Sequence, residues 1–192
     1  GEGEAQASRM VAKKDAYAIA SQDADSLLFG ATRIVRNLSI EGRRKRAGVL
    51  GYGKVEPELI LLEEVLSSLG VTQQQLICLA MLVGTDYNTG GIKGIGPKTA
   101  LKTVKEHKTP EKIFAAAEWG KHFSYPWQEV LELFEHPSQT DDYELKFHPI
   151  NTSKLVKILC EKHDFSEQRV EKQLEELDKA ATTKKQKGLG EF

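Results

Sequence analysis

The sequence predicts an α/β fold in which helices outnumber strands. Two short strand-like runs lie near the start of the chain: residues 16–21 are mostly apolar, and residues 32–38 alternate apolar and charged side chains. From residue 58 onward, most segments instead repeat apolar residues at helical spacing. With 192 residues, 40% hydrophobic and 29% charged, the chain has the size and composition of one globular domain, or of one domain with a tail.

The composition excludes several classes of protein. No apolar run approaches the roughly 20 residues that a membrane span needs, and the acidic, small-residue start does not resemble a signal peptide. Cys78 and Cys160 are too few for a disulfide framework and lack zinc-site spacing, so we expect buried free thiols in a reducing compartment. The net charge of −1 neither supports nor excludes nucleic-acid binding, which would require segregated charges.

Two glutamates stand at the start of the first predicted helix, which spans residues 1–14. Acidic residues at a helix N-terminus complement the helix dipole, so capping is one explanation for Glu2 and Glu4, and a metal site is the other. Residues two apart on a helix point roughly 200° apart. Both glutamates could therefore serve one site only if the helix begins near Gly3.

Two aspartates follow directly on the first predicted strand, residues 16–21. Ligands of open α/β sheets bind outside the carboxyl ends of the strands, so Asp23 and Asp25 are placed for chemistry. The alternative is a surface turn that caps a short helix over residues 26–29. The two roles are compatible.

A second strand is predicted over residues 32–38. The basic residues 43–46 are predicted to form a hairpin tip, with a returning strand over residues 50–55. This tip is either a solvated loop or a contact to a phosphate backbone. Residues 58–69 have the apolar pattern of an amphipathic helix that ends at Gly70.

A second helix is predicted to follow at once. Thr72 is its expected N-cap, with Gln75 completing a capping box. The helix over residues 73–83 is apolar on nearly every side toward its end, so it should be buried.

A glycine-rich segment, residues 84–100, follows this buried helix. Asp86 precedes four glycines that allow positive φ and close approach to a ligand; they are Gly90, Gly91, Gly94 and Gly96. Pro97 suits the first turn of a helix, and free backbone N–H groups at such an N-terminus form an anion site. The next helix carries Lys98, Lys102 and Lys105 on one face, and Lys93 and Lys108 extend the positive charge. A plain loop between two helices is the alternative.

The last third of the chain is mostly helical in pattern. Aromatic residues gather between two predicted helices, 109–117 and 128–134, where core packing is favoured over base stacking; they are Trp119, Phe123, Tyr125 and Trp127. A short strand over residues 143–147 and helices over 152–160 and 166–177 follow. The lysine-rich residues 179–192 are predicted to be disordered.

Three motifs stand in order along the chain: GEGEAQAS, SQDADSLLFG and GTDYNTGGIKGIGPK. They resemble the motifs of the flap endonucleases, the structure-specific 5′ nuclease family, and their wording is closer to the archaeal members. The resemblance implies a helix–two-turn–helix segment at about residues 72–108. It also implies the catalytic and metal-binding residues Glu2, Glu4, Asp23, Asp25 and Asp86.

The resemblance implies phosphodiester hydrolysis with two divalent cations, for which hard oxygen ligands favour Mg²⁺ or Mn²⁺. A K⁺ ion in the glycine turn is a further possibility. The expected substrate is branched DNA with a 5′ flap, recognised by shape during replication, including Okazaki-fragment maturation, and repair. The implied DNA-binding residues are Lys93, Gly94, Gly96, Lys98, Lys102, Lys105 and Lys108.

The end of the tail resembles a sliding-clamp-binding motif, implying the clamp (PCNA) as a partner. Gln186, Leu189 and Phe192 match it, but the second aromatic of the pattern is missing. A plain charged terminus is the alternative. No membrane partner is expected, and the implied location is cytoplasmic for an archaeal protein or nuclear for a eukaryotic one.

The family's fold begins before this chain does. Its N-terminal part contributes the first strand, two further aspartates and an arch around single-stranded DNA, so the chain is expected to be a C-terminal portion. Residues 1–178 would then form a partial, mostly parallel sheet flanked by helices, with residues 179–192 as a flexible tail. The missing part is an expected partner, and the isolated chain is expected to be inactive. Two alternatives remain open: a non-catalytic DNA- and clamp-binding module, and a sister 5′ exonuclease or junction nuclease.

Overall fold

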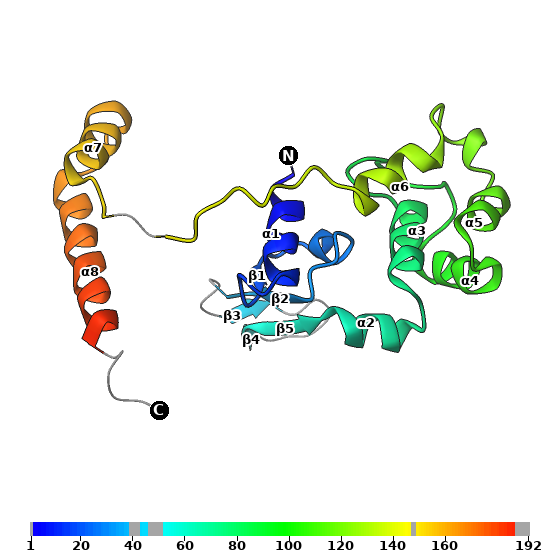
Figure 1. Cartoon of the computed structure of the whole chain (residues 1–192), viewed down its shortest axis with the longest axis horizontal. Coiled ribbons are helices and arrows are strands. Elements are labelled where there is room, and N and C mark those ends of the chain that lie inside the picture. Colours follow the sequence, from blue (N-terminus) through cyan, green and yellow to red (C-terminus); the bar gives the residue numbers. More distant parts are fainter. Residues whose placement is uncertain (1, 39–42, 46–51, 147–148, 187–192) are drawn as a thin grey trace. The chain divides into compact units, whose positions relative to one another are not determined.

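The computed structural model describes residues 2–38, 43–45, 52–146 and 149–186. The chain divides into two compact units, Gly1–Asp142 and Tyr143–Phe192. The sequence pattern had suggested a boundary at residue 178. Each unit is described by itself below, and both are drawn in Figure 1.

The first unit contains a small mixed sheet in the order β1-β2-β5. Strand β1 (Ile19–Ala20) pairs parallel to β2 (Arg33–Arg36), and β2 pairs antiparallel to β5 (Glu58–Leu61). The prediction of a mostly parallel sheet is therefore wrong. Parallel neighbours need a long crossover connection, usually a helix, whereas the described part of the connection from β2 to β5 holds only the hairpin of β3 (Arg43–Lys45) and β4 (Tyr52–Lys54).

Two sequence predictions fail in this region. The stretch 58–69 was expected to be one helix, but its first four residues form β5 and only Leu62–Leu69 form helix α2. Pairing with β2 outweighs the helical pattern there, because propensity is a weak prior against tertiary context. The basic residues 43–45 lie in β3 and not at the hairpin tip; residue 46 lies outside the described residues.

Helices outnumber strands in the described part of the first unit (Figure 1). They are α1 (Gly3–Ala12), the 3₁₀ turn η1 (Asp25–Leu27), α2, α3 (Gln73–Val83), α4 (Pro97–His107), α5 (Pro110–Ala116), the 3₁₀ turn η2 (Trp119–Lys121) and α6 (Trp127–Glu135). Helix α3 contacts α4, α5 and α6. It therefore forms the centre of this part of the core.

Helix α3 begins and ends as its sequence predicts. The Thr72–Gln75 capping box is present, and Gly70 ends α2 in the left-handed region with φ of 64°. Met81 and Leu82 are fully buried, as is Cys78, whose thiol pKa is raised to about 12 by burial. Both cysteines are free, but Cys160 is only half-buried, so the expectation of burial holds for Cys78 alone.

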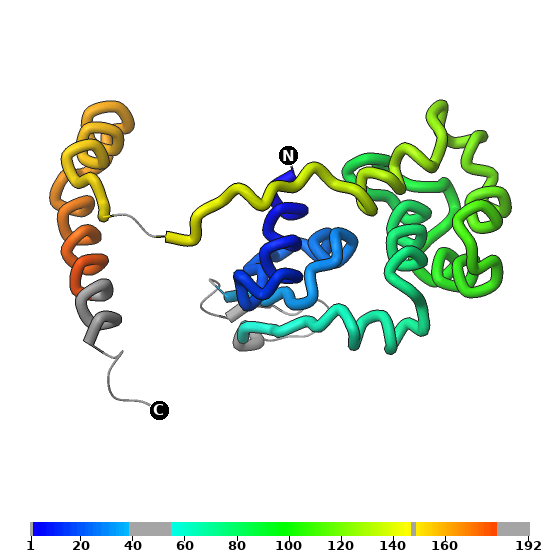
Figure 2. The backbone as a smooth tube through the Cα atoms, viewed as in Figure 1, coloured from blue at the N-terminus to red at the C-terminus, as the bar shows by residue number. Residues whose placement is uncertain are grey.

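The second unit is built from α7 (Thr152–Val156), a π-helical turn labelled η3 (Lys157–Glu161) and α8 (Glu167–Gln186). Figure 2 shows the chain reversing direction between α7 and α8. Residues 143–146 form no strand, contrary to prediction, and Phe147 lies outside the described residues. Helix α8 runs through residues 179–186, which were expected to be disordered; Leu189 and Phe192 of the clamp motif also lie outside the description.

No single described helix is long and apolar enough to cross a membrane. Within the part of the chain that the structure describes, one bent pair of helices, α2 and α3 across a bend of 76°, has that length and composition.

Candidate functional site

The five predicted carboxylates come from three separate segments of the first unit. Glu2 is the N-cap residue of α1 and Glu4 lies in its first turn. Asp23 and Asp25 follow β1, and Asp86 lies in the turn after α3. Because α1 begins at Gly3 and Glu2 has extended φ and ψ of −67° and 126°, the condition under which both glutamates can face one site is met.

The electrostatics of these groups place them near one another. The pKa of Glu4 is raised, first by burial and then by the charges of Asp23 and Asp25. The pKa of Asp25 is raised in the same way, by burial and then by Asp23, Asp86 and Glu2. Like charges disfavour ionisation only when they are close. All five carboxylates therefore share one electrostatic neighbourhood.

Hydroxyl groups hold two of these carboxylates. The Tyr87 hydroxyl donates to Glu2 Oε2 at 3.3 Å, and the Ser21 hydroxyl donates to Glu4 Oε1 at 3.4 Å. The pKa of Tyr87 is raised by burial and then by the charge of Glu2. The sequence interpretation missed both residues, although each stands one or two positions from a predicted aspartate. That adjacency is the signal that could have found them.

Asp23 also lies in a surface turn, as its alternative role required, but no side chain caps the helical turn that follows, which spans Asp25–Leu27 in place of the predicted residues 26–29. Its Oδ1 accepts from the backbone N–H of Ala24 at 2.7 Å and of Asp25 at 3.4 Å, and Ser21 Oγ accepts from the N–H of Asp23. This turn leads into η1, whose first residue is Asp25. The turn thus fixes where Asp23 and Asp25 stand after β1.

The five carboxylates are suitable ligands for hard divalent cations, although their side chains do not converge on one point. Among the residues that the structure describes, no group of three acidic, histidine or cysteine side chains is placed to hold a metal ion. The ion pairs found there involve other carboxylates. Mutually repelling carboxylate oxygens are the ligands that Mg²⁺ and Mn²⁺ prefer, and a cation would relieve the repulsion.

The turn that carries Asp86 is held by a buried asparagine. Asn88 Nδ2 donates to the carbonyl of Met81 at 2.6 Å, and Asn88 Oδ1 accepts from Thr85 Oγ1 at 2.6 Å. The backbone N–H of Ile92 donates to the carbonyl of Leu82 at 2.9 Å, which folds the glycine turn back on α3. Asp86 therefore projects from a braced turn.

The glycine turn confirms positive φ at three of the four predicted glycines. Gly90, Gly91 and Gly94 have φ of 84°, 58° and 88°, but Gly96 has φ of −89° and is the extended N-cap residue of α4. The prediction for Gly96 is wrong because a helix N-cap takes β-region angles. Nothing lies within 4 Å of a Cβ built at Gly94 or Gly96, so this side of the turn is open to a ligand.

Helix α4 and the residues on either side of it present the predicted lysines to solvent. Pro97 occupies its first turn, and Ala100 and Val104 bury the opposite face. The lysine side chains are exposed; they are Lys93, Lys98, Lys102, Lys105 and Lys108. Lys105 leans toward Gly70, with Nζ 3.5 Å from a Cβ built there. The open glycine turn and the exposed lysines adjoin through the N-terminus of α4.

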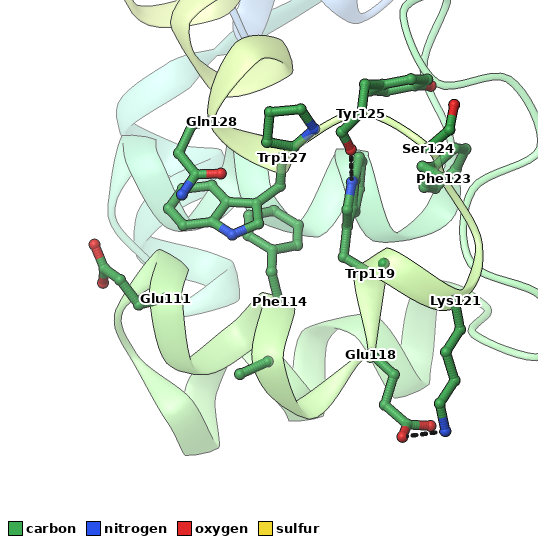
Figure 3. A pocket seen from close by; sticks show the side chains of 13 residues that line it. Glu111, Phe114, Glu118, Trp119, Lys121, Phe123, Ser124, Tyr125, Trp127 and Gln128 are labelled. Atoms are coloured by element: carbon green, nitrogen blue, oxygen red, sulfur yellow. Dashed lines mark hydrogen bonds and ion pairs between the residues drawn. The ribbon is translucent and has the colours of Figure 1, made fainter.

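The aromatic residues between α5 and α6 pack on one another around an open pocket of about 850 Å³ (Figure 3). Phe114 stacks on Trp127 at 5.0 Å and meets Trp119 edge-on at 5.2 Å, and Trp119 is 3% exposed. Trp119 Nε1 donates to the Tyr125 carbonyl at 2.8 Å, and the Tyr125 hydroxyl donates to the Tyr87 carbonyl at 3.2 Å. Packing, the favoured interpretation, is therefore confirmed, and the cluster supports the turn beside Asp86.

The comparisons with known proteins all point to one family of nucleases. The family model of the XPG I-region matches residues 1–86. Flap endonuclease 1 of Thermococcus onnurineus is 53% identical over 188 residues, covering 98% of this chain and 54% of that protein. The protein of that name from Thermofilum pendens is 51% identical over 182 residues, covering 95% of this chain and 52% of that protein.

Solved structures show the same likeness. The flap endonuclease-1 from Methanococcus jannaschii matches with a TM-score of 0.76 and 37% identity, covering 96% of this chain and 52% of that one. The catalytic core of Rad2 matches with a TM-score of 0.65 and 21% identity, covering 89% of this chain and 64% of that one, which is a likeness of fold. The chain thus spans about half the length of the curated relatives that it matches.

Proposed function

The chain is homologous to the archaeal flap endonucleases over nearly its whole length, and from this premise we propose that it is the C-terminal portion of a structure-specific 5′ flap endonuclease. Its role would be hydrolysis of DNA phosphodiesters in replication, including Okazaki-fragment maturation, and in repair. If the protein is archaeal, its location would be the cytoplasm.

The observation that carries the proposal is the mutual electrostatic influence of five carboxylates that come from three segments. Burial and mutual repulsion raise the pKa of Glu4 and Asp25, so the site favours binding of positive charge. We infer that Glu2, Glu4 and Asp23 would hold one Mg²⁺ or Mn²⁺ ion and that Asp25 and Asp86 would complete a second site. Two such ions stabilise the attacking and leaving oxygens of a phosphoryl transfer.

The glycine turn and the N-terminus of α4 would bind the DNA backbone. Backbone N–H groups at a helix N-terminus and exposed lysines favour phosphate, and such contacts position a duplex without reading its sequence. The residues proposed for this role are Lys93, Gly94, Gly96, Lys98, Lys102, Lys105 and Lys108. A K⁺ ion in the turn, which the family resemblance suggested, stays a prediction.

Clamp binding by the C-terminal end also stays a prediction. Gln186 is the last residue of α8, and the other two motif residues, Leu189 and Phe192, lie outside the described part of the chain. The proposed partner is the sliding clamp (PCNA). Comparing the affinity of the clamp for this chain with its affinity for a chain that ends at Gln186 would test the motif.

The decisive experiment measures Mg²⁺-dependent cleavage of a 5′-flap oligonucleotide. The chain is assayed alone and mixed with the N-terminal part of an archaeal flap endonuclease, because it spans about half the length of its relatives. We expect cleavage in the mixture and its loss in Asp25→Asn with DNA binding retained. Glu129→Gln, an exposed carboxylate on α6, is the matched control and should cleave like the unaltered chain.

A non-catalytic DNA-binding module is the second candidate. It is favoured by the spacing of the carboxylates, since no three of the described ones are placed to hold one ion. DNA binding without cleavage in either assay would support it, as would an Asp23→Asn variant that behaves like the unaltered chain.

A further inference from the structure

A short segment of the first unit lies against α1. We call residues Gln139–Asp141 the strap. The side chain of Gln6 makes two hydrogen bonds with the backbone of Thr140: Nε2 donates to the Thr140 carbonyl at 2.9 Å, and Oε1 accepts from the Thr140 N–H at 2.8 Å. The strap is therefore bound to α1 over more than 130 positions of sequence separation.

Two basic residues hold the end of the strap: Arg9, which lies in α1, and Lys13, which is the C-cap residue of α1. Arg9 donates to Asp141 through two nitrogens, Nε to Oδ1 at 2.7 Å and Nη2 to Oδ2 at 2.5 Å. Lys13 Nζ lies 2.9 Å from the same Oδ1. A bidentate arginine–carboxylate pair fixes orientation as well as distance. These contacts reach from the middle of α1 to its end.

The start of the strap reaches the turn that carries the glutamates. Gln139 Nε2 donates to the Ala5 carbonyl at 2.7 Å, one residue after Glu4. The N-terminus of α1 has no side-chain cap, because Glu2 makes no capping hydrogen bond. The strap thus contacts the helix in the turn that has no side-chain cap.

The opposite side of α1 is fixed by the core. Ala5, Ser8 and Val11 are buried, and Ser8 Oγ donates to the carbonyls of Glu4 and Ser26 at 2.7 and 3.1 Å. The helix is therefore held on two sides, by the core and by the strap. A helix held on two sides cannot tilt without breaking one set of contacts.

We propose that the strap is a positioning device, which holds α1 so that Glu2 and Glu4 face Asp23 and Asp25. This inference rests on the proposed function. The carboxylates repel one another, so the helix end that carries two of them needs a restraint against moving away. Metal sites require their ligands to be held by neighbouring contacts to a fraction of an ångström, and Gln139 and Asp141 supply such contacts without touching the carboxylates.

The test compares four variants of the whole chain, of which one is a control and one restores the carboxylate. Asp141→Asn removes the charge that Arg9 and Lys13 bind, and Gln139→Ala removes the contact to Ala5. Asp142→Asn is the matched control, since it makes the same charge change at the next, exposed residue. Hydrogen exchange of residues 3–12 and of 73–83 is measured, together with Mn²⁺ affinity by electron paramagnetic resonance.

In Asp141→Asn and Gln139→Ala, exchange should rise in α1 and not in α3, and Mn²⁺ affinity should fall by about tenfold. Asp141→Glu, which keeps the carboxylate, should recover most of the affinity, and Asp142→Asn should match the unaltered chain. Unchanged exchange and affinity in Asp141→Asn would overturn the proposal, as would a uniform rise of exchange in both helices. If neither the unaltered chain nor its mixture with the N-terminal part of an archaeal flap endonuclease binds Mn²⁺, the proposed function fails and the strap's positioning role fails with it. Normal Mn²⁺ binding that the strap variants leave unchanged defeats the strap proposal alone.

Discussion

Asn88 is the buried polar residue on which the Asp86 turn depends. It is 1% exposed and donates to the Met81 carbonyl. Asn88→Asp replaces this donor with an acceptor of the same shape, leaving a buried carbonyl without its partner. The free energy of unfolding should fall by about 1–3 kcal/mol in urea denaturation. Asn151→Asp is the control: Asn151 caps α7 by accepting from Lys154 N–H, which aspartate does equally well, so equal losses would contradict the argument.

Alanine substitutions at Gly90 and Gly91 distinguish the cost of backbone strain from the cost of steric overlap. Both have positive φ, but a Cβ at Gly91 would lie 2.3 Å from the backbone of Val83, whereas nothing lies within 4 Å at Gly90. Gly90→Ala should lower the free energy of unfolding by about 1–2 kcal/mol through φ alone. Gly91→Ala adds the overlap and should cost at least about 3 kcal/mol. Equal midpoints in thermal unfolding would refute this distinction.

Some residues of the site can be predicted from sequence and some cannot. The aspartates could be predicted because each stands beside a recognisable element, after a strand or before a glycine turn. The contact between Tyr87 and Glu2 joins positions 85 apart, and that between Gln139 and Ala5 joins positions 134 apart. No local pattern specifies such partners, since they meet only through the packing of the fold.

At the scale of elements, sequence motifs predict helix ends correctly where the residues involved lie within one turn of each other. The capping box at Thr72 and the C-cap at Gly70 mark α3 and α2 correctly, because both are formed by residues a few positions apart. The stretch 58–61 resembles helix but pairs with β2, a partner more than 20 positions away. The order of β1, β2 and β5 likewise depends on the path of the intervening chain and not on any strand alone.

The strap should stabilise α1 in a pH-dependent way. Hydrogen bonds from Arg9 and Lys13 hold the pKa of Asp141 well below its usual range. A carboxyl whose folded pKa is depressed contributes stability above its unfolded pKa, about 3.9, and loses that contribution as the pH falls toward the folded pKa. The melting temperatures of the unaltered chain and Asp141→Asn should therefore differ near neutral pH and converge in acid. A difference that stays constant down to pH 2 would contradict the role of this charge.

At the scale of the whole molecule, the division into two units should be visible to a protease. Residues 143–146 form neither helix nor strand, and the Lys146 side chain is 69% exposed. Brief trypsin treatment should make its earliest internal cut after Lys146, because an exposed irregular segment fits a protease better than a helix does. Mass spectrometry should find residues 1–146 as a persistent fragment. Lys146→Gln should delay that cut, and a first cut among the lysines of α4 would count against two units.

The aromatic cluster gives the protein a built-in optical reporter. Both tryptophans of the chain flank Phe114 in that cluster (Figure 3), so the tryptophan emission of the whole protein comes from this cluster. The cluster is joined to the carboxylates by hydrogen bonds: the Tyr125 hydroxyl donates to the Tyr87 carbonyl, and the Tyr87 hydroxyl donates to Glu2. The wavelength of the tryptophan emission therefore reports on the surroundings of the aromatic cluster beside the carboxylates, with no dye attached and no residue changed.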